Sequence, residues 1–101
     1  MYVVEFLKTA EEELGRLPKD AQRNIVRRVE GLKHIPRPPG VERLKGAEKL
    51  FRLRVGDYRV VYTVESRHLV VLVVRIGHRK EVYENLNVLA SRVLIWKQRK
   101  K

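Results

Sequence analysis

Four arginines in the second half of the chain have the spacing of a phosphate-binding site. The stretch 51–62 reads FRLRVGDYRVVY, and polar and apolar residues alternate along it. Three of its polar positions are Arg52, Arg54 and Arg59, and Arg79 follows in the segment GHRKEVY. Guanidinium groups that meet at one place bind phosphate oxygens and stabilise charge that develops on them. These residue types therefore predict chemistry on an anion, provided that the fold gathers them.

The alternation predicts two strands joined at Gly56-Asp57, since a two-residue loop with glycine first is typical of a type II′ hairpin turn. This turn would place Arg54 directly opposite Arg59, with Arg52 on the same face of the sheet. Like charges in opposite positions destabilise a strand pair by up to ~1 kcal/mol. We therefore infer that a bound anion offsets the repulsion. The other face is expected to form core and carries Phe51, Leu53, Val55, Tyr58, Val60 and Tyr62.

A second hairpin is expected to bring Arg79 to the same edge of the sheet. With its turn at 66–67, this hairpin would place the residues after Ile76 beside the turn of the first hairpin. His78 and Arg79 would then emerge next to the other arginines, and Tyr83 would follow one turn into a helix. The expected product is a cationic concavity with His78 and Tyr83 at its rim.

A competing interpretation is that these arginines are solvated and paired with acidic residues. His78 would then be an exposed residue at a strand end, and Tyr83 would only pack a helix. Arg75 interrupts an apolar run, and the alternation assigns it to neither face. The candidate acids for such pairs are Glu48, Glu65 and Glu81.

Two helices are expected between an N-terminal strand at 2–6 and the hairpins. Thr9 fits the N-cap of a capping box with Glu12, and this first helix ends at Pro18. The second helix is predicted from about 19 to 34, where the proline-rich IPRPPG ends it. Its core stripe consists of Ala21, Ile25, Val29 and Leu32.

Strands are predicted over 49–55, 58–64 and 68–76, and the last is apolar on both faces, as in a central strand. A C-terminal helix over 82–97 follows. Together these elements predict an α+β fold with an N-terminal strand, an antiparallel two-helix hairpin, a three-stranded antiparallel meander and a C-terminal helix. The apolar seam of that helix is Val82, Leu86, Leu89, Val93 and Trp96. Apolar residues off the seam, which indicate burial by a second chain, are Val88, Leu94 and Ile95.

Composition limits the classes of protein. The 101 residues carry 23 Lys and Arg against 12 Asp and Glu, a net charge of +11, and end in a basic tail at 97–101. This excess predicts a polyanion or an acidic protein as partner. There is no cysteine, no apolar run near the ~20 residues of a membrane span and no secretory signal pattern. We expect a single cytoplasmic domain over 1–101.

The segments LFRLRVGDYRVVYTV and VVLVVRIGHRKEVY strongly resemble the RelE/ParE superfamily of type II toxin–antitoxin toxins. The likeness covers about residues 2–84 and takes in LPKDAQ and VERLKG. Length and the GHRKEVY ending are closer to the RelE branch, whose members are ribosome-dependent mRNA endonucleases. The resemblance implies a RelE-like fold and cleavage of mRNA in the ribosomal A site. There the toxin would contact both mRNA and ribosomal RNA. It also implies a RelB-like antitoxin in a heterotetramer; a homodimer of the free toxin is the alternative.

The resemblance also assigns roles to the candidate residues. The family's phosphate-contacting pair falls on Arg52 and Arg54, its transition-state arginines fall on Arg59 and Arg79, and its catalytic tyrosine falls on Tyr83. In-line attack of the ribose 2′-oxygen on the neighbouring phosphorus would give a 2′,3′-cyclic phosphate and a free 5′-hydroxyl, with no metal or cofactor.

This chain departs from the best-known members of the branch, which carry lysines where it has Arg52 and Arg54. Lysine can lose its proton and act as a base, whereas arginine stays charged. The base would then be His78, a residue type that titrates near neutral pH, or Tyr83 as a phenolate. Lys80 is a third candidate and a further RNA contact. The alternative functions are a ParE-like toxin that poisons DNA gyrase and a basic RNA-binding module without activity.

Overall fold

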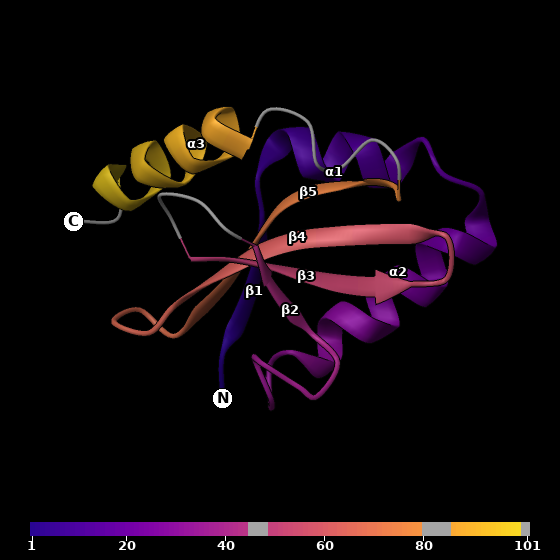
Figure 1. Cartoon of the computed structure of the whole chain (residues 1–101), viewed down its shortest axis with the longest axis horizontal. Helices are drawn as coiled ribbons and strands as arrows, with labels where there is room; N and C mark the ends of the chain where they lie inside the picture. The colour runs from indigo at the N-terminus through magenta and orange to yellow at the C-terminus, as the bar shows by residue number, and fades with distance from the viewer. Residues whose placement is uncertain (45–48, 80–85, 100–101) are drawn as a thin grey trace.

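The computed structural model describes residues 1–44, 49–79 and 86–99, which form one sheet with helices on both of its faces (Figure 1). The α+β class and the order of the predicted elements are confirmed. No helix in the described parts of the chain is long and apolar enough to cross a membrane. The elements are β1 (Val3–Phe6), α1 (Lys8–Gly15), α2 (Lys19–Gly31), β2 (Glu42–Leu44), β3 (Leu50–Val55), β4 (Tyr58–Glu65), β5 (Val70–His78) and α3 (Leu86–Arg99).

The described strands form a five-stranded sheet in the order β1-β5-β4-β3-β2. β3, β4 and β5 are the predicted antiparallel meander, and β1 lies parallel to β5 at one edge. β2 was not predicted, because its three residues are too few to show an alternating pattern. It pairs antiparallel with β3 at the other edge, so β3 is an inner strand.

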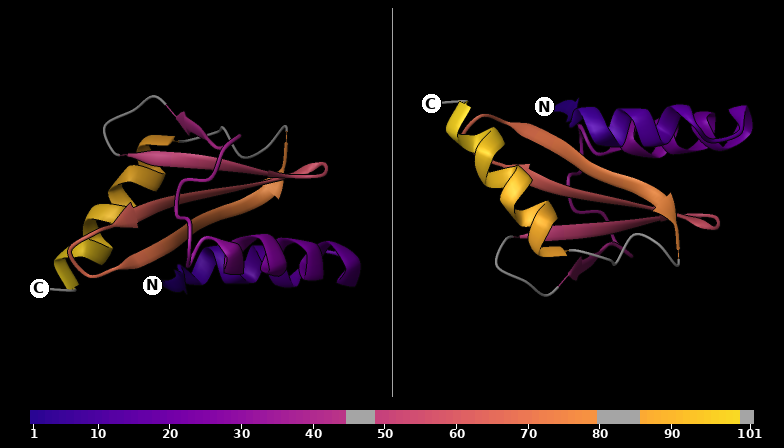
Figure 2. Two further views of the ribbon diagram at one scale, coloured as in Figure 1. Left: turned by 90° about the horizontal axis from the view of Figure 1, so that it is seen from below. Right: turned by 90° about the horizontal axis from the view of Figure 1, so that it is seen from above.

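The two faces of the sheet carry separate cores (Figure 2). α1 and α2 pack on one face over the predicted core residues of β3 and β4, which confirms the assignment of faces in the first hairpin. α3 crosses the other face and covers a second core with Leu89, Val93 and Trp96. The second core also contains Leu50, Val61, Val70, Leu72 and Val74.

α3 thus uses its predicted seam to pack on its own sheet. The off-seam residues stay outside, since Val88, Leu94 and Ile95 are each about half exposed. The helix ends at Arg99 rather than 97. Its predicted start at Val82 lies outside the described residues.

The pairing of β3 with β4 is the predicted one, with Val55 opposite Tyr58 and Arg54 opposite Arg59. Gly56 has a φ of 59°, a conformation that side chains with a Cβ rarely adopt. Because the φ of the next residue is not positive, the turn has the signs of type II′. The glycine therefore fixes the register that sets the arginines opposite each other.

The predicted pairing of β4 with β5 was wrong. The turn spans 66–69 rather than 66–67, and Leu69 at its end has a φ of 55°. Glu65 consequently pairs with Val70. A bulge follows, because Tyr62 pairs with Val73 whereas Val61 pairs with Arg75. Its extra residue restores Ile76 to the core under α1 and α2.

Two helix boundaries also differ from the prediction. α1 begins one residue before Thr9, its N-cap is Leu7, and no side chain caps it, so the capping box does not form. The amide of Glu11 instead donates to the Leu7 carbonyl at 3.0 Å. α2 ends at Gly31, and residues 32–34 form turns instead of a last helical turn.

Candidate phosphate-binding site

Arg59 is the one charged residue that is buried in the described parts of the chain, with 8% of its surface exposed. Its Nη1 donates to the carbonyl oxygens of Gly56 at 2.9 Å and Tyr58 at 2.8 Å, so the guanidinium folds back onto the β3–β4 turn. No carboxylate of the described residues forms an ion pair with it. A buried cation without a counter-ion is unfavourable. Arg59 therefore favours binding of an external anion.

The backbone positions of Arg54 and Arg79 lie on the two sides of Arg59. Arg54 is the cross-strand neighbour of Arg59 and is exposed. On the other side Arg59 pairs with Gly77, two residues before Arg79. The amide of Arg79 donates to the carbonyl of Asp57 at 3.0 Å, which holds the end of β5 beside the β3–β4 turn. Arg54 on β3, Arg59 on β4 and Arg79 directly after β5 thus lie on neighbouring parts of the backbone.

Arg52 differs from the other arginines because it has an acidic neighbour. It forms an ion pair with Glu42, its direct cross-strand partner on β2. The side chain of Arg52 is 23% exposed and that of Glu42 is 65% exposed, and such surface pairs contribute about 0–1 kcal/mol. Pairing with an acid was the competing interpretation, although the acid is not one of those considered. The pairing of Arg52 with Glu42 could not be predicted, because β2, the strand that carries Glu42, was not recognised.

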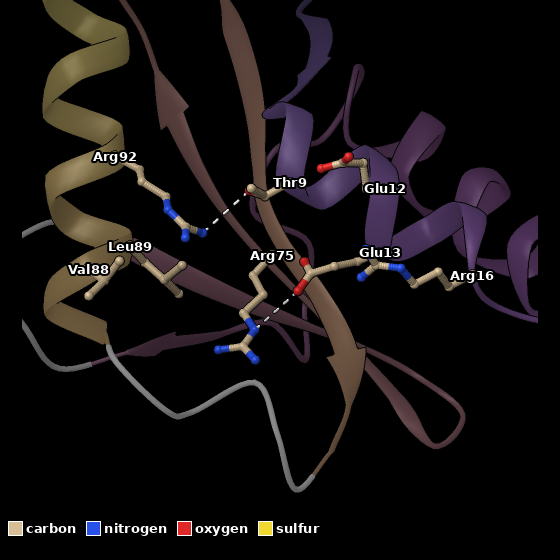
Figure 3. Close-up of a pocket in the computed structure, with 8 residues that line it drawn as sticks. All are labelled: Thr9, Glu12, Glu13, Arg16, Arg75, Val88, Leu89 and Arg92. Atoms are coloured by element: carbon tan, nitrogen blue, oxygen red, sulfur yellow. Dashed lines mark hydrogen bonds and ion pairs between the residues drawn. The ribbon is translucent and has the colours of Figure 1, made fainter.

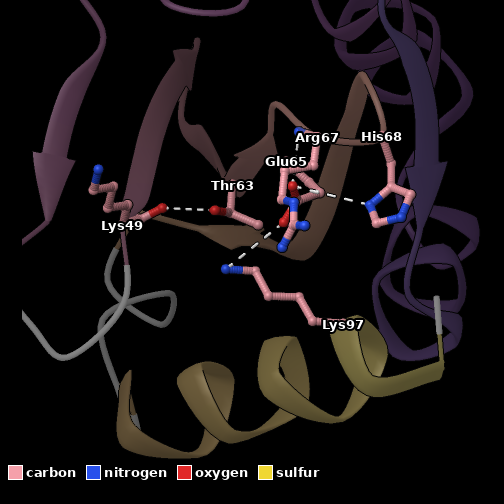
Figure 4. A network of polar contacts seen from close by, with 6 residues as sticks. All are labelled: Lys49, Thr63, Glu65, Arg67, His68 and Lys97. Carbon is pink, nitrogen blue, oxygen red and sulfur yellow. Dashed lines mark hydrogen bonds and ion pairs between the residues drawn. The ribbon is translucent and has the colours of Figure 1, made fainter. Parts of the chain in front are cut away.

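Glu65, one of the acids considered as a partner, is occupied elsewhere (Figure 4). It lies at the end of β4 away from Arg59, where it accepts a hydrogen bond from the amide of Arg67 at 2.9 Å. Lys97 of α3 and His68 each lie 4.0 Å from its carboxylate. Glu65 therefore does not compensate the charge of the arginines near the other end of the sheet.

The structure does not bring the His78 ring to the arginines. His78 pairs with Tyr58, and the two rings meet edge to face with centroids 6.2 Å apart. Tyr58 packs against the core under α1 and α2. His78 and Tyr58 line a cavity of about 320 Å³ together with Glu13 of α1 and Arg16, which follows α1 directly. The imidazole thus lies on the helix-hairpin side of the sheet, opposite the face of Arg54 and Arg59.

Tyr83 and Lys80 lie outside the described residues, as do Glu48 and Glu81 among the acids considered. The cationic concavity with Tyr83 at its rim therefore stays a prediction. Within the described residues the arrangement is a group of cations on the α3 face, near the β3–β4 turn. The guanidinium of Arg59 is anchored on two backbone carbonyls. Guanidinium groups in this arrangement are suited to bind a phosphate and to neutralise charge on it.

The prediction missed a residue that acts on the end of β5. Glu13 of α1 accepts a hydrogen bond from the amide of Ile76 at 3.0 Å, and its other carboxylate oxygen lies 3.6 Å from Nε of Arg75. Both contacts bring together residues that are far apart in the sequence. No motif indicates such a contact, since a glutamate on a helix is ordinarily a solvated residue.

Comparisons with known proteins agree with this fold. Residues 4–83 match the family model described as the ParE toxin of the type II toxin–antitoxin system parDE. The chain is 31% identical over 85 residues to a toxin named RelE1 of Methanocaldococcus jannaschii, covering 81% of this chain and 94% of that one. It is 30% identical over 83 residues to toxin RelG of Mycobacterium tuberculosis, covering 81% and 95%.

A solved structure gives the same result in three dimensions. The archaeal RelE–RelB complex from Pyrococcus horikoshii superposes with a TM-score of 0.70 at 30% identity, covering 79% of this chain and 97% of that one. α3 begins after the last residue that the family model matches.

Proposed function

Because this chain belongs to the RelE/ParE superfamily of type II toxin–antitoxin toxins, with RelE proteins among its relatives, we propose that it is a ribosome-dependent mRNA endonuclease. The observation that carries the proposal is the buried Arg59, which has no carboxylate partner among the described residues. Arg54 pairs with Arg59 on one side, and Gly77, two residues before Arg79, pairs with it on the other. Arg54, Arg59 and Arg79 are called the arginine group below. A phosphodiester supplies the negative charge that Arg59 lacks among the described residues.

The reaction is an in-line displacement at phosphorus. The ribose 2′-oxygen forms a bond to the adjacent phosphorus and gives its proton to a base, while the bond to the 5′-oxygen breaks and that oxygen takes up a proton. Arg59 and Arg79 neutralise the charge that grows on the phosphoryl oxygens. Arg54 holds a flanking phosphate, and Arg52 does so after it leaves Glu42.

The base is Tyr83, acting as a phenolate, the form that nearby cations would favour. Arg52 and Arg54 stay protonated and cannot serve. The contact of the His78 ring with Tyr58, on the α1 side of the sheet, supports Tyr83 over His78. Lys80 adds a contact to the RNA backbone.

The partner that silences this toxin is a RelB-like antitoxin. The archaeal relative of known structure is a RelE–RelB complex, which supports a similar assembly here, and a heterotetramer is its expected form. The substrate is mRNA held against ribosomal RNA, to which the net charge of +11 is suited. The site of action is the cytoplasm.

The decisive experiment compares Arg79→Ala with Arg67→Ala on translating ribosomes. Arg67 is an exposed arginine of the β4–β5 turn, at the far end of the sheet, and serves as the matched control. Arg79→Ala should slow mRNA cleavage on the order of 10²–10³-fold and abolish growth inhibition, while antitoxin binding persists. A folded Arg79→Ala variant with full toxicity would remove the nuclease assignment.

The match to a ParE family model favours one other candidate, a toxin that binds DNA gyrase and cleaves nothing. Inhibition of supercoiling by the wild-type chain, without mRNA cleavage on ribosomes, would establish that alternative. A basic RNA-binding module would show neither effect, only binding that weakens as salt rises.

A further inference from the structure

Glu13 connects α1 to the end of β5 that leads to His78 and Arg79. Its Oε1 accepts a hydrogen bond from the amide of Ile76 at 3.0 Å. Its Oε2 lies 3.6 Å from Nε of Arg75. Figure 3 shows Glu13 extending from α1 to Arg75, within a cleft of about 310 Å³ that Thr9, Arg16 and Arg92 also line.

The hydrogen bond falls where β5 has lost its outer neighbour. The parallel ladder between β1 and β5 ends at Phe6 and Val73, and Leu7 adds one last bond to the Val73 carbonyl at 2.9 Å. Beyond this point the outward amide of Ile76 faces none of the described strands. An unpaired backbone donor at a partly buried position is costly. The Glu13 carboxylate supplies the missing acceptor and continues the edge of the sheet beyond β1.

The end of β5 is therefore held from both sides. On the inner side it pairs with β4 as far as His78, and the amide of Arg79 donates to the Asp57 carbonyl. On the outer side Glu13 is the acceptor for Ile76. These contacts fix the point at which the chain leaves the sheet. That point is Arg79, two residues after Gly77, the partner of Arg59.

We propose that Glu13 is a positioning residue, whose carboxylate oxygen holds the end of β5 so that Arg79 stays beside Arg59. The activity part of this inference rests on the proposed nuclease function. Displacement of a charge-stabilising group by about 1 Å can lower a rate on the order of 100-fold. Glu13 touches neither Arg59 nor Arg79, so it acts through the backbone of Ile76.

The test separates the hydrogen-bond acceptor from the charge. Glu13→Gln keeps an oxygen that can accept from Ile76 and loses the negative charge, whereas Glu13→Ala loses both. Glu12→Ala is the matched control, because Glu12 is an exposed neighbour on the same helix. Each variant is assayed for kcat and KM of mRNA cleavage on ribosomes and for hydrogen exchange of amides 76–79.

Glu13→Ala should lower kcat on the order of 10- to 100-fold with KM little changed, and amides 76–79 should exchange faster. Glu13→Gln should restore most of kcat and protection, and Glu12→Ala should match wild type. Wild-type kcat in Glu13→Ala, or a loss in Glu13→Gln as large as in Glu13→Ala, would overturn the proposal.

A second control removes general destabilisation as the cause. Ile25→Val shortens a buried core residue of α2 and leaves Glu13 unchanged. If Ile25→Val, compared while fully folded, loses as much kcat as Glu13→Ala, the role of Glu13 is only structural and the proposal fails. If the wild-type chain cleaves no mRNA, the nuclease function fails separately. The exchange measurements then still decide whether Glu13 holds the end of β5.

Discussion

Replacing Arg54 by glutamine removes one of two like charges that face each other across β3 and β4. Directly opposed residues have Cβ atoms about 4.5–5.5 Å apart, and opposed like charges cost some tenths of a kcal/mol up to ~1 kcal/mol. Coulomb's law gives about 0.7 kcal/mol for unit charges ~6 Å apart in water. Arg59 is anchored on two carbonyls and cannot move away. Only the exposed Arg54 can adjust, so a gain of about 0.5 kcal/mol on its removal is expected.

The assay is thermal and urea unfolding of the free proteins in low salt and in 1 M salt. A gain of about 0.5 kcal/mol corresponds to a rise in Tm of roughly 2–4 °C for a domain of this size. The rise should disappear in 1 M salt, where the screening length is about 3 Å. Added phosphate should stabilise wild type more than Arg54→Gln, because binding to the folded state raises stability. The same variant should cleave mRNA more slowly.

Arg43→Gln is the matched control, since Arg43 is an exposed strand arginine that faces Phe51 rather than a cation. Its Tm should depend little on salt relative to wild type. An Arg54→Gln variant that is less stable than wild type in low salt would refute the reasoning. So would a gain that persists unchanged in 1 M salt, because the repulsion would then not be its source.

Further predictions concern the residues that support the arginine group. Arg52→Ala should reduce cleavage less than Arg54→Ala does, because Glu42 already competes for Arg52; equal losses on ribosomes would contradict this. Gly56→Ala should lower the free energy of unfolding by about 1–2 kcal/mol, measured in urea, through backbone strain at φ 59° rather than a clash. Burial raises the pKa of Tyr62 to about 12, so the unfolded chain loses this proton first and stability falls between pH 10 and 12 by about 1.4 kcal/mol per pH unit. Tyr62→Phe should lack that decline and lose about 1 kcal/mol at neutral pH, as its hydroxyl donates to the Pro36 carbonyl at 2.7 Å; parallel pH curves would contradict this.

The first hairpin could be predicted to the residue because Gly56 determines one turn type and hence one pairing. The second could not, for two physical reasons. Its turn ends at Leu69 with a positive φ, although leucine carries no signal for that conformation. The run LVVLVV is apolar on both faces, so alternation along it has no phase from which a bulge could be recognised.

The candidate site was predictable in part for the same reason. Arg54 and Arg59 follow from the glycine turn, and Arg79 comes to their edge despite the wrong register, because β5 runs two residues further than expected. The direction of the His78 ring depended on the bulge and was missed. The pairing of Arg52 with Glu42 depended on β2, a three-residue strand that tertiary contacts select rather than local propensity.

The parallel pairing of β1 with β5 has a consequence for synthesis of this chain. Val3 can pair with Val70 only after Val70 has been synthesised. β1 therefore stays unpaired with β5 during most of translation. Contacts of such long range slow folding, since the loop between them must be ordered first. A nascent chain interrupted before β5 carries neither the strand that completes the sheet nor Arg79. We therefore expect products terminated before β5 to be non-toxic, so that toxicity arises only from a nearly full-length polypeptide.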